Sequence, residues 1–285
     1  MASERKVRGL RERVHPKACI SETAQLAADV QVGAYTIIGP DVVIHEGCTI
    51  GPHVTIAGRT EIGPRTRIYT GALIGVADPA GFRSDRGCDD GADTTTTPST
   101  PAQARQLIIG ADNIIREYAV LRPGNKITGP TQVGDGNFIM GYVYLGSGCQ
   151  IGNGVIITQA THLGDGVTVE DGAVISGLSE IAAGVRIGEL AMVGAVTCIR
   201  ADIPPYLMVA GNPPQVHGIN VVGLRRHEIS PEDRADLKRA FKIIYRTNQP
   251  LATSIEELSR EFPHSPLVQH LIEFLRQSRR GVFQQ

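Results

Sequence analysis

The chain has 285 residues, enough for one or two domains, and 41% of them are hydrophobic, as in ordinary globular proteins. Its 28 basic and 29 acidic residues leave a net charge of −1 at pH 7, which gives no reason to expect nucleic acid or a membrane surface as a partner. Only 5% of the residues are aromatic and tryptophan is absent, which suits a thin aliphatic core.

The N-terminal arm, residues 1–13, is basic and lacks the apolar stretch of a signal peptide. No apolar run reaches the roughly 18 residues that a membrane-spanning helix needs. The five cysteines show no metal-ligand spacing, so we expect reduced structural thiols and no metal site. These features predict a cytoplasmic protein.

An aliphatic residue recurs at every sixth position over two long stretches. The first stretch comprises Val14, Ile20, Leu26, Val32, Ile38, Ile44, Ile50, Ile56, Ile62, Ile68 and Ile74. The second comprises Ile109, Ile115, Leu121, Ile127, Val133, Ile139, Leu145, Ile151, Ile157, Leu163, Val169, Ile175, Ile181, Ile187, Val193 and Ile199. A period of six fits neither an α-helix nor a simple alternating strand.

This period predicts a mostly β fold, a β-solenoid over residues 14–200, in which three short faces form each coil and one aliphatic side chain per face points inward. Glycine often follows the aliphatic position, as at Gly33 and Gly51, and eases the tight corners. Successive coils should stack at roughly 4.8 Å, so residues eighteen apart become direct neighbours.

The segment 77–106, rich in Asp, Thr, Pro and Gly, interrupts the period and is expected to be a mobile loop outside the column. Residues 201–285 form a connector followed by a small C-terminal helical domain. Ser230 before Pro231 predicts the start of a first helix, and Ser254 with Glu257 predicts a capping box for a second. Ser265 opens a third helix.

Several short motifs resemble those of a known family, the UDP-N-acetylglucosamine O-acyltransferases of lipid A biosynthesis. They are Ile115-Arg116-Glu117, Leu121-Arg122, Met140, Cys149, Pro204-Pro205-Tyr206, Gly211-Asn212, Gly218-Ile219-Asn220, Gly223-Leu224-Arg225-Arg226 and Ile244-Tyr245-Arg246. The resemblance extends from about His15 to the C-terminus. It implies a left-handed parallel β-helix, a homotrimer, and sites in clefts between neighbouring columns.

The resemblance also implies a reaction, in which a 3-hydroxyacyl group passes from acyl carrier protein to the 3-hydroxyl of UDP-N-acetylglucosamine or a related UDP-amino sugar. No cofactor is expected. Among substrate-binding positions, Asn220 and Arg226 match the family's nucleotide contacts, and Arg83 retains a cation in the loop. The acidic partner of the family is replaced by Val222, and its second arginine by His227.

The catalytic positions depart from the family pattern. Ser147 stands where the resemblance places the general-base histidine, and Tyr144 stands at a neighbouring histidine position. Two further histidine positions hold Gly166 and Ala182, and the oxyanion-side glycine is replaced by Asp165. A carboxylate there would oppose a developing oxyanion unless it points away.

His162 is the histidine of the central coils and could act as a substitute base. Because it lies eighteen residues after Tyr144 and eighteen before Glu180, these three should form a ladder, beside a second ladder of Ser147 and Asp165. Ser147 would then be a nucleophile or a substrate-binding hydroxyl. The alternative is that both ladders are polar decoration of solvent-facing edges.

The basic residues from Arg225 to Arg246 fit docking of an acidic carrier protein or a diphosphate, or simply a solvated helix face. Two functions therefore stand at this stage: an active O-acyltransferase with an altered base, and a catalytically inactive paralogue that binds a nucleotide sugar or acyl carrier protein. A sugar N-acyltransferase on the same column is disfavoured, because that class also uses a histidine base and lacks the long helical tail. A zinc enzyme is disfavoured because three converging histidines are missing from the central coils.

Overall fold

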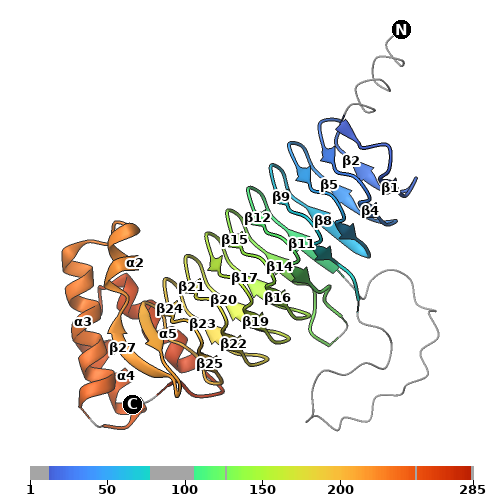
Figure 1. Ribbon diagram of the computed structural model, residues 1–285. Coiled ribbons are helices and arrows are strands. Elements are labelled where there is room, and N and C mark those ends of the chain that lie inside the picture. Colours follow the sequence, from blue (N-terminus) through green and yellow to red (C-terminus); the bar gives the residue numbers. More distant parts are fainter. Residues whose placement is uncertain (1–12, 78–105, 126, 248, 284–285) are drawn as a thin grey trace, which may run out of the picture.

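The computed structural model describes residues 13–77, 106–125, 127–247 and 249–283. They form a three-sided column of stacked coils that carries a group of helices at its C-terminal end (Figure 1). Each side of the column is one parallel sheet, so the fold is mostly β, a parallel β-helix, as predicted. None of the helices in this part of the chain has the length and apolarity needed to cross a bilayer.

Successive strands along the chain belong to three different sheets, here called faces 1, 2 and 3. Face 1 contains β1 (Cys19–Ile20), β4 (Ile37–Ile38), β7 (Thr55–Ile56), β10 (Leu73–Ile74), β13 (Val120–Leu121), β16 (Tyr144–Leu145), β19 (His162–Leu163), β22 (Glu180–Ile181) and β25 (Cys198–Ile199). Face 2 contains β2 (Gln25–Leu26), β5 (Val43–Ile44), β8 (Arg59–Ile62), β11 (Gln106–Ile109), β14 (Thr131–Val133), β17 (Gln150–Ile151), β20 (Thr168–Val169) and β23 (Arg186–Ile187).

Face 3 contains β3 (Gln31–Val32), β6 (Thr49–Ile50), β9 (Arg67–Ile68), β12 (Ile114–Ile115), β15 (Phe138–Ile139), β18 (Ile156–Ile157), β21 (Val174–Ile175), β24 (Met192–Val193), β26 (Leu207–Ala210) and β27 (Gln215–Ile219). The last two strands form an antiparallel hairpin, which extends face 3 out of the predicted connector. The connector is thus part of the sheet rather than a simple linker.

The core of the column is the predicted row of aliphatic side chains. In most strands the second residue is buried and the first faces outward, as in β18, where Ile157 is fully buried beside the half-buried Ile156. Small corner residues such as Val155 and Val167 fill the remaining interior. Backbone hydrogen bonds join each strand to the next coil, so the column needs only one inward residue per face.

One predicted inward residue is not inward: Ile127 is 91% exposed. Face 1 passes to face 2 here through the longer segment between β13 and β14, and Leu121 pairs with Leu145, twenty-four residues on. The side-chain oxygen of Asn125 accepts hydrogen bonds from the backbone N–H groups of Ile127 and Thr128. This local turn lifts Ile127 out of the column, so the prediction at this position is wrong.

The helices are α2 (Val221–Arg226), α3 (Pro231–Arg246), α4 (Leu251–Glu261) and α5 (Pro266–Gln277). As predicted, the Ser230 side chain caps α3 by accepting the Asp233 backbone N–H. The predicted cap at Ser254 is wrong, because α4 begins three residues earlier and buries Ser254. There the Ser254 hydroxyl donates to the carbonyl of Ile243 and ties α4 to α3.

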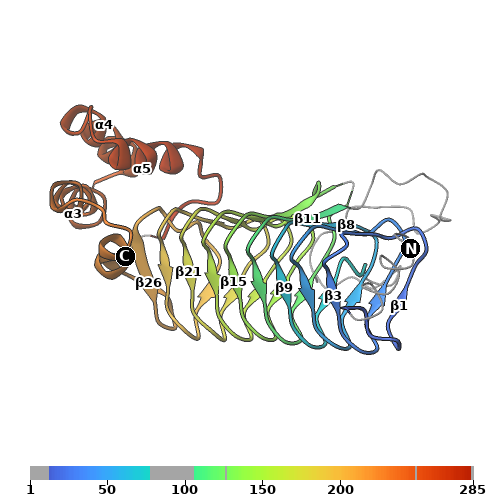
Figure 2. The ribbon, with the colours of Figure 1, turned by 90° about the horizontal axis from the view of Figure 1, so that it is seen from above.

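Helices α3, α4 and α5 lie together at one end of the column (Figure 2). They share an apolar core with two residues of the column end, Leu190 and the fully buried Tyr206. Helices α3 to α5 therefore pack on the coils of the same chain, and Phe241 and Tyr245 of α3 join the apolar cluster of the column itself.

Candidate functional site

The predicted ladder on face 1 exists. Tyr144 pairs with His162, and His162 pairs with Glu180, in the register of strands β16, β19 and β22. The rings of Tyr144 and His162 stack with centroids 4.7 Å apart and an angle of 9° between their planes. This stacking limits how far the exposed imidazole can rotate and thereby holds its two nitrogens at the edge of the ladder.

Arg122 interacts with Tyr144, the first residue of this ladder. Its guanidinium carbon lies 5.5 Å from the centre of the Tyr144 ring, and its Nε donates to the tyrosine hydroxyl at 3.4 Å. Its Nη1 donates to the carbonyl of Val76 at 2.8 Å. A cation thus lies beside Tyr144, the ring on which His162 stacks, a feature that spacing by eighteen did not reveal.

The side chain of His162 is exposed, and within the described residues its ring nitrogens make no hydrogen bond. An imidazole with an accessible nitrogen can accept a proton from a bound hydroxyl group. Glu180 lies one coil further along the ladder and is also exposed, but the structure has no ion pair between it and His162. The ladder is therefore present, whereas its role stays a prediction.

Ser147 and Asp165 form the second ladder, at the corner between faces 1 and 2. Asp165 lies in the next coil along the chain, and its carboxylate accepts the backbone N–H of Ser147 at 2.8 Å. The same bond recurs at the corner between faces 2 and 3, where Asn153 accepts from Asp135 and Asp171 accepts from Asn153. One oxygen of Asp165 thus joins two coils, and this contact is structural.

The predicted nucleotide-contacting residues lie on the opposite side of the column. Asn220 is buried; its side-chain amide donates to the carbonyl of Leu190 at 2.8 Å, and its oxygen caps α2 by accepting the N–H of Gly223. Arg226 is exposed in the last turn of α2. Because Leu190 lies at the corner between faces 2 and 3, which is opposite face 1, Asn220 and Arg226 are not brought to His162 within one chain.

The remaining predicted features either lie outside the described residues or are not arranged for catalysis or metal binding. Arg83, the loop 77–106 except its ends, and most of the arm 1–13 fall outside the described residues. Burial raises the pKa of the Cys149 thiol to about 12, so it is not a thiolate at neutral pH. Among the described residues no group of His, Cys, Asp and Glu is arranged to hold a metal ion.

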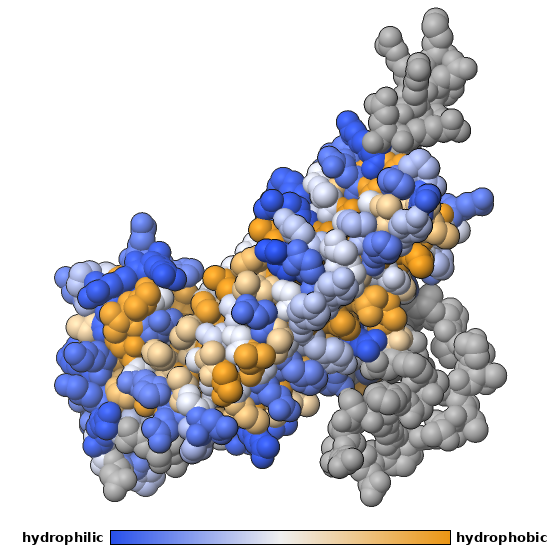
Figure 3. All heavy atoms as spheres, viewed as in Figure 1, coloured by the Kyte–Doolittle hydropathy of each residue, from blue (hydrophilic) through white to orange (hydrophobic). Residues whose placement is uncertain are grey.

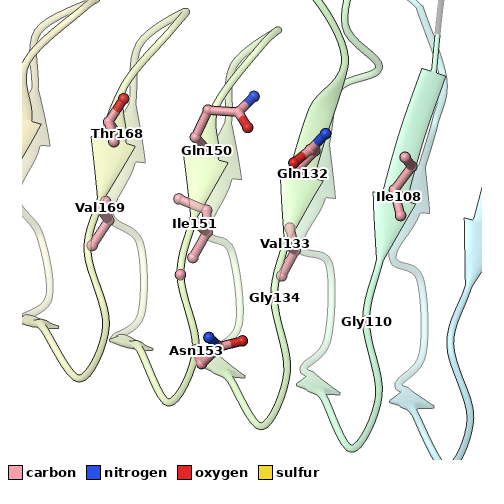
Figure 4. A pocket seen from close by; sticks show the side chains of 11 residues that line it. Ile108, Gly110, Gln132, Val133, Gly134, Gln150, Ile151, Asn153, Thr168 and Val169 are labelled. Carbon is pink, nitrogen blue, oxygen red and sulfur yellow. The ribbon is translucent and has the colours of Figure 1, made fainter.

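A shallow groove of about 480 Å³ runs along face 2 (Figure 4). Its walls are uncharged and include Ile108, Gln132, Gln150 and Thr168. The groove contains none of the predicted site residues and no titratable side chain, so it offers no acid or base.

Comparisons with known proteins agree with the fold and the motifs. A family described as UDP-N-acetylglucosamine O-acyltransferase, domain 2, matches residues 202–283, and the bacterial transferase hexapeptide family matches 23–58, 41–75 and 130–159. The acyl-[acyl-carrier-protein]–UDP-N-acetylglucosamine O-acyltransferase of Saccharophagus degradans is 38% identical over 94% of this chain and 98% of its own length. The chain belongs to the UDP-N-acetylglucosamine O-acyltransferase family.

Further members of this family show the same extent of likeness. The Halorhodospira halophila protein of the same name is 36% identical over 95% of this chain and 98% of its own length. The solved UDP-N-acetylglucosamine acyltransferase of Francisella novicida superposes with a TM-score of 0.86 at 30% identity, covering 95% of this chain and 94% of that one. The family assignment made from the motifs is confirmed, and it includes the column and the helices.

Proposed function

We propose that this protein transfers a 3-hydroxyacyl group from acyl carrier protein to the 3-hydroxyl of UDP-N-acetylglucosamine or a related UDP-amino sugar. The observation that carries the proposal is the near full-length likeness, 34% to 38% identity over 98% of their length, to relatives named for that reaction. Because the likeness covers the helices as well as the repeats, it supports more than the acyltransferase fold alone.

His162 is proposed to be the general base, because Ser147 stands where the family resemblance places that base. Its imidazole takes the proton of the sugar 3-hydroxyl as that oxygen forms a bond to the thioester carbonyl carbon. The carbon–sulfur bond then breaks, and the imidazolium gives this proton to the departing carrier thiolate. Tyr144 holds the ring by stacking, at 4.7 Å between centroids, and Ser147 supplies a hydroxyl hydrogen bond to the substrate.

The proposal includes a homotrimer with each site shared between two columns. This part is supported by the separation of the two groups of predicted residues in one chain. His162 lies on face 1, whereas Arg226 lies at the opposite corner of the column. A second copy that places its α2 beside face 1 would unite them. Asn220 then acts by holding α2 in place, and Arg226 contacts the diphosphate.

A cytoplasmic location is part of the same proposal, because the acyl donor is an intracellular carrier. Cys19, Cys48, Cys149 and Cys198 are all free thiols, which suits a reducing compartment. Neither nucleic acid nor a cofactor enters the proposed reaction.

The test is an acyl-transfer assay with purified protein, acyl carrier thioesters of several chain lengths and UDP-N-acetylglucosamine. We expect turnover, and we expect His162→Ala to lower kcat by about 10²- to 10⁴-fold, the usual contribution of a general base. His53→Ala is the matched control, because His53 is also exposed on the column and stacks on a tyrosine, Tyr35, at 5.1 Å.

Two results would redirect the proposal. Turnover that survives His162→Ala but falls on Ser147→Ala would move the catalytic role to the corner residue. Binding of UDP-N-acetylglucosamine with no transfer of any acyl chain would instead favour the inactive paralogue, which the likeness to named enzymes does not favour.

A further inference from the structure

A second histidine lies in a charged cluster at the junction between the helices and the column. His270 of α5 places its Nε2 at 3.1 Å from a carboxylate oxygen of Glu170 and its Nδ1 at 3.1 Å from one of Glu189. The two glutamates follow β20 and β23 and therefore lie on successive coils. The Glu170 carboxylate also accepts the backbone N–H of Glu189 at 2.8 Å, which fixes the spacing of the pair.

Tyr206 completes this cluster from the inside. Its side chain is fully buried, and its hydroxyl donates to Glu189 at 2.8 Å and lies 2.8 Å from Nδ1 of His270. Its backbone has φ +69°, the left-handed conformation that corner residues such as Leu178 and Val196 also adopt. The hydroxyl therefore ties the cluster to a corner of the column.

Tyr206 also connects the cluster to helix α2. Its carbonyl accepts the backbone N–H of Asn220 at 2.6 Å, and the Asn220 side chain bonds to the carbonyl of Leu190, the residue after Glu189. At the other end of α2, the ring of His227 lies against Gly172, close to Glu170 in the chain. Helix α2 thus rests on the same two corners that hold His270.

We infer that His270 is a positioning residue for substrate binding: by bridging Glu170 and Glu189 it fixes Tyr206, and Tyr206 fixes the helix that presents Arg226. The role of Arg226 in this inference rests on the proposed function, whereas the connection from His270 through Tyr206 to α2 does not. His270 touches neither the proposed base nor the sugar, so it is not a catalytic residue. Its effect should fall on binding of the nucleotide sugar.

The connection should depend on pH. The charged and titratable groups facing His270 are Glu170, Glu189 and Tyr206, with Arg186 at 3.7 Å from Glu170 and His227 near Glu189. The two carboxylates raise the pKa of His270 to about 9, above its ordinary 6.5, so the imidazolium is present at neutral pH. Its contribution is complete below pH 6.5 and is lost as the pH rises through 9.

The experiment is amide hydrogen exchange of the full chain, read at residues 221–226, together with KM for UDP-N-acetylglucosamine. In His270→Gln we expect exchange at 221–226 to rise roughly tenfold or more, the fold-change of one charge-assisted hydrogen bond. KM should rise by a similar factor while kcat changes little. Glu189→Gln is the second variant, since its amide oxygen still accepts from Tyr206, and His264→Gln in the exposed turn between α4 and α5 is the control.

The pH profile distinguishes positioning from simple anchoring. After correction for the intrinsic exchange rate, exchange at 221–226 in the unaltered protein should increase between pH 6.5 and 9, and this increase should be missing in His270→Gln. If the variant loosens only 266–277 and leaves 221–226 unchanged, the inference is wrong. A wild-type protein that transfers no acyl group would defeat the proposed function, yet the exchange results would still decide the inference.

Discussion

The column and the helical end of this molecule are held together by different forces. Inside the column, aliphatic side chains recur once per face and strands pair coil to coil, so the interior that the structure describes is held by apolar packing and backbone hydrogen bonds. At the helical end, an apolar core shared with the coils is supplemented by one histidine that bridges two glutamates of the coils. The first arrangement should be insensitive to pH, whereas the second should respond to it.

The surface shows no such division between the two regions. Apolar and polar residues are interspersed over the column and the helices (Figure 3), and several exposed apolar side chains belong to corner residues such as Tyr142, Leu178 and Val196. The surroundings of His162 and His270 do differ. His162 keeps its ring nitrogens accessible on face 1, while His270 uses both of its nitrogens to hold two carboxylates. An accessible nitrogen suits proton transfer, and a bridged imidazolium suits positioning.

The largest expected effect tests the column. Ile157→Ala should lower the free energy of unfolding by about 2–5 kcal/mol, because it removes a fully buried side chain and leaves a cavity. Ile127→Ala occupies the same repeat position in sequence but is 91% exposed, so it should change stability by less than about 0.5 kcal/mol. Chemical denaturation of both variants checks this, and equal losses would contradict the solvent-facing position of Ile127.

An intermediate effect tests the helical end. The raised pKa of His270, about 9 against 6.5 in the unfolded chain, predicts that the helices lose stability as the pH rises from 6.5 to 9. Hydrogen bonding to His270 and Tyr206 lowers the pKa of Glu189, so its contribution is present above its usual pKa of 4.5 and is lost on acidification below it. Limited proteolysis of the helical end across this range should therefore be slowest near neutral pH.

The matching variant is His270→Gln, in which the alkaline half of that profile should become flat. Cleavage within the column should remain slow at every pH in both proteins. A column that opens before the helices do would reverse the comparison between the two regions.

The smallest expected effect concerns Asp165. Asp165→Asn keeps an oxygen that accepts the Ser147 N–H, so both stability and kcat should stay close to those of the unaltered protein. Asp165→Ala removes the acceptor and should cost about 0.5–1.5 kcal/mol, the net value of one hydrogen bond. Thermal unfolding measures the stability of both variants, and the acyl-transfer assay measures their kcat. A large fall in kcat for Asp165→Asn would mean that the charge acts in the reaction.

Much of the column could be predicted from the sequence because one geometric rule repeats in it. The pairing of Tyr144 with His162 and Glu180 follows from a spacing of eighteen. The rule failed at Ile127, where a side-chain turn at Asn125 outweighs the apolar period. A different rule failed at Ser254, where burial against α3 outweighs the local capping pattern.

The contacts of Arg122 and of His270 had no such signal. Arg122 reaches the carbonyl of Val76 across the interruption of the repeat, forty-six residues away in sequence. In the cluster at the helical end, residues 170, 189 and 206 lie on successive coils, close to the spacing of eighteen, but residue 270 shares no period with them. Only the docking of α5 on the coils brings His270 to the other three.

The repeat of six by itself determined the column, its inward residues and the ladder on face 1, because each coil meets only its neighbours and a local spacing therefore becomes a contact. The tertiary structure decided which side of the column each motif occupies, where the helices dock, and which histidine is bridged. Those outcomes depend on packing between segments far apart in the chain, and no spacing along the sequence encodes such distances.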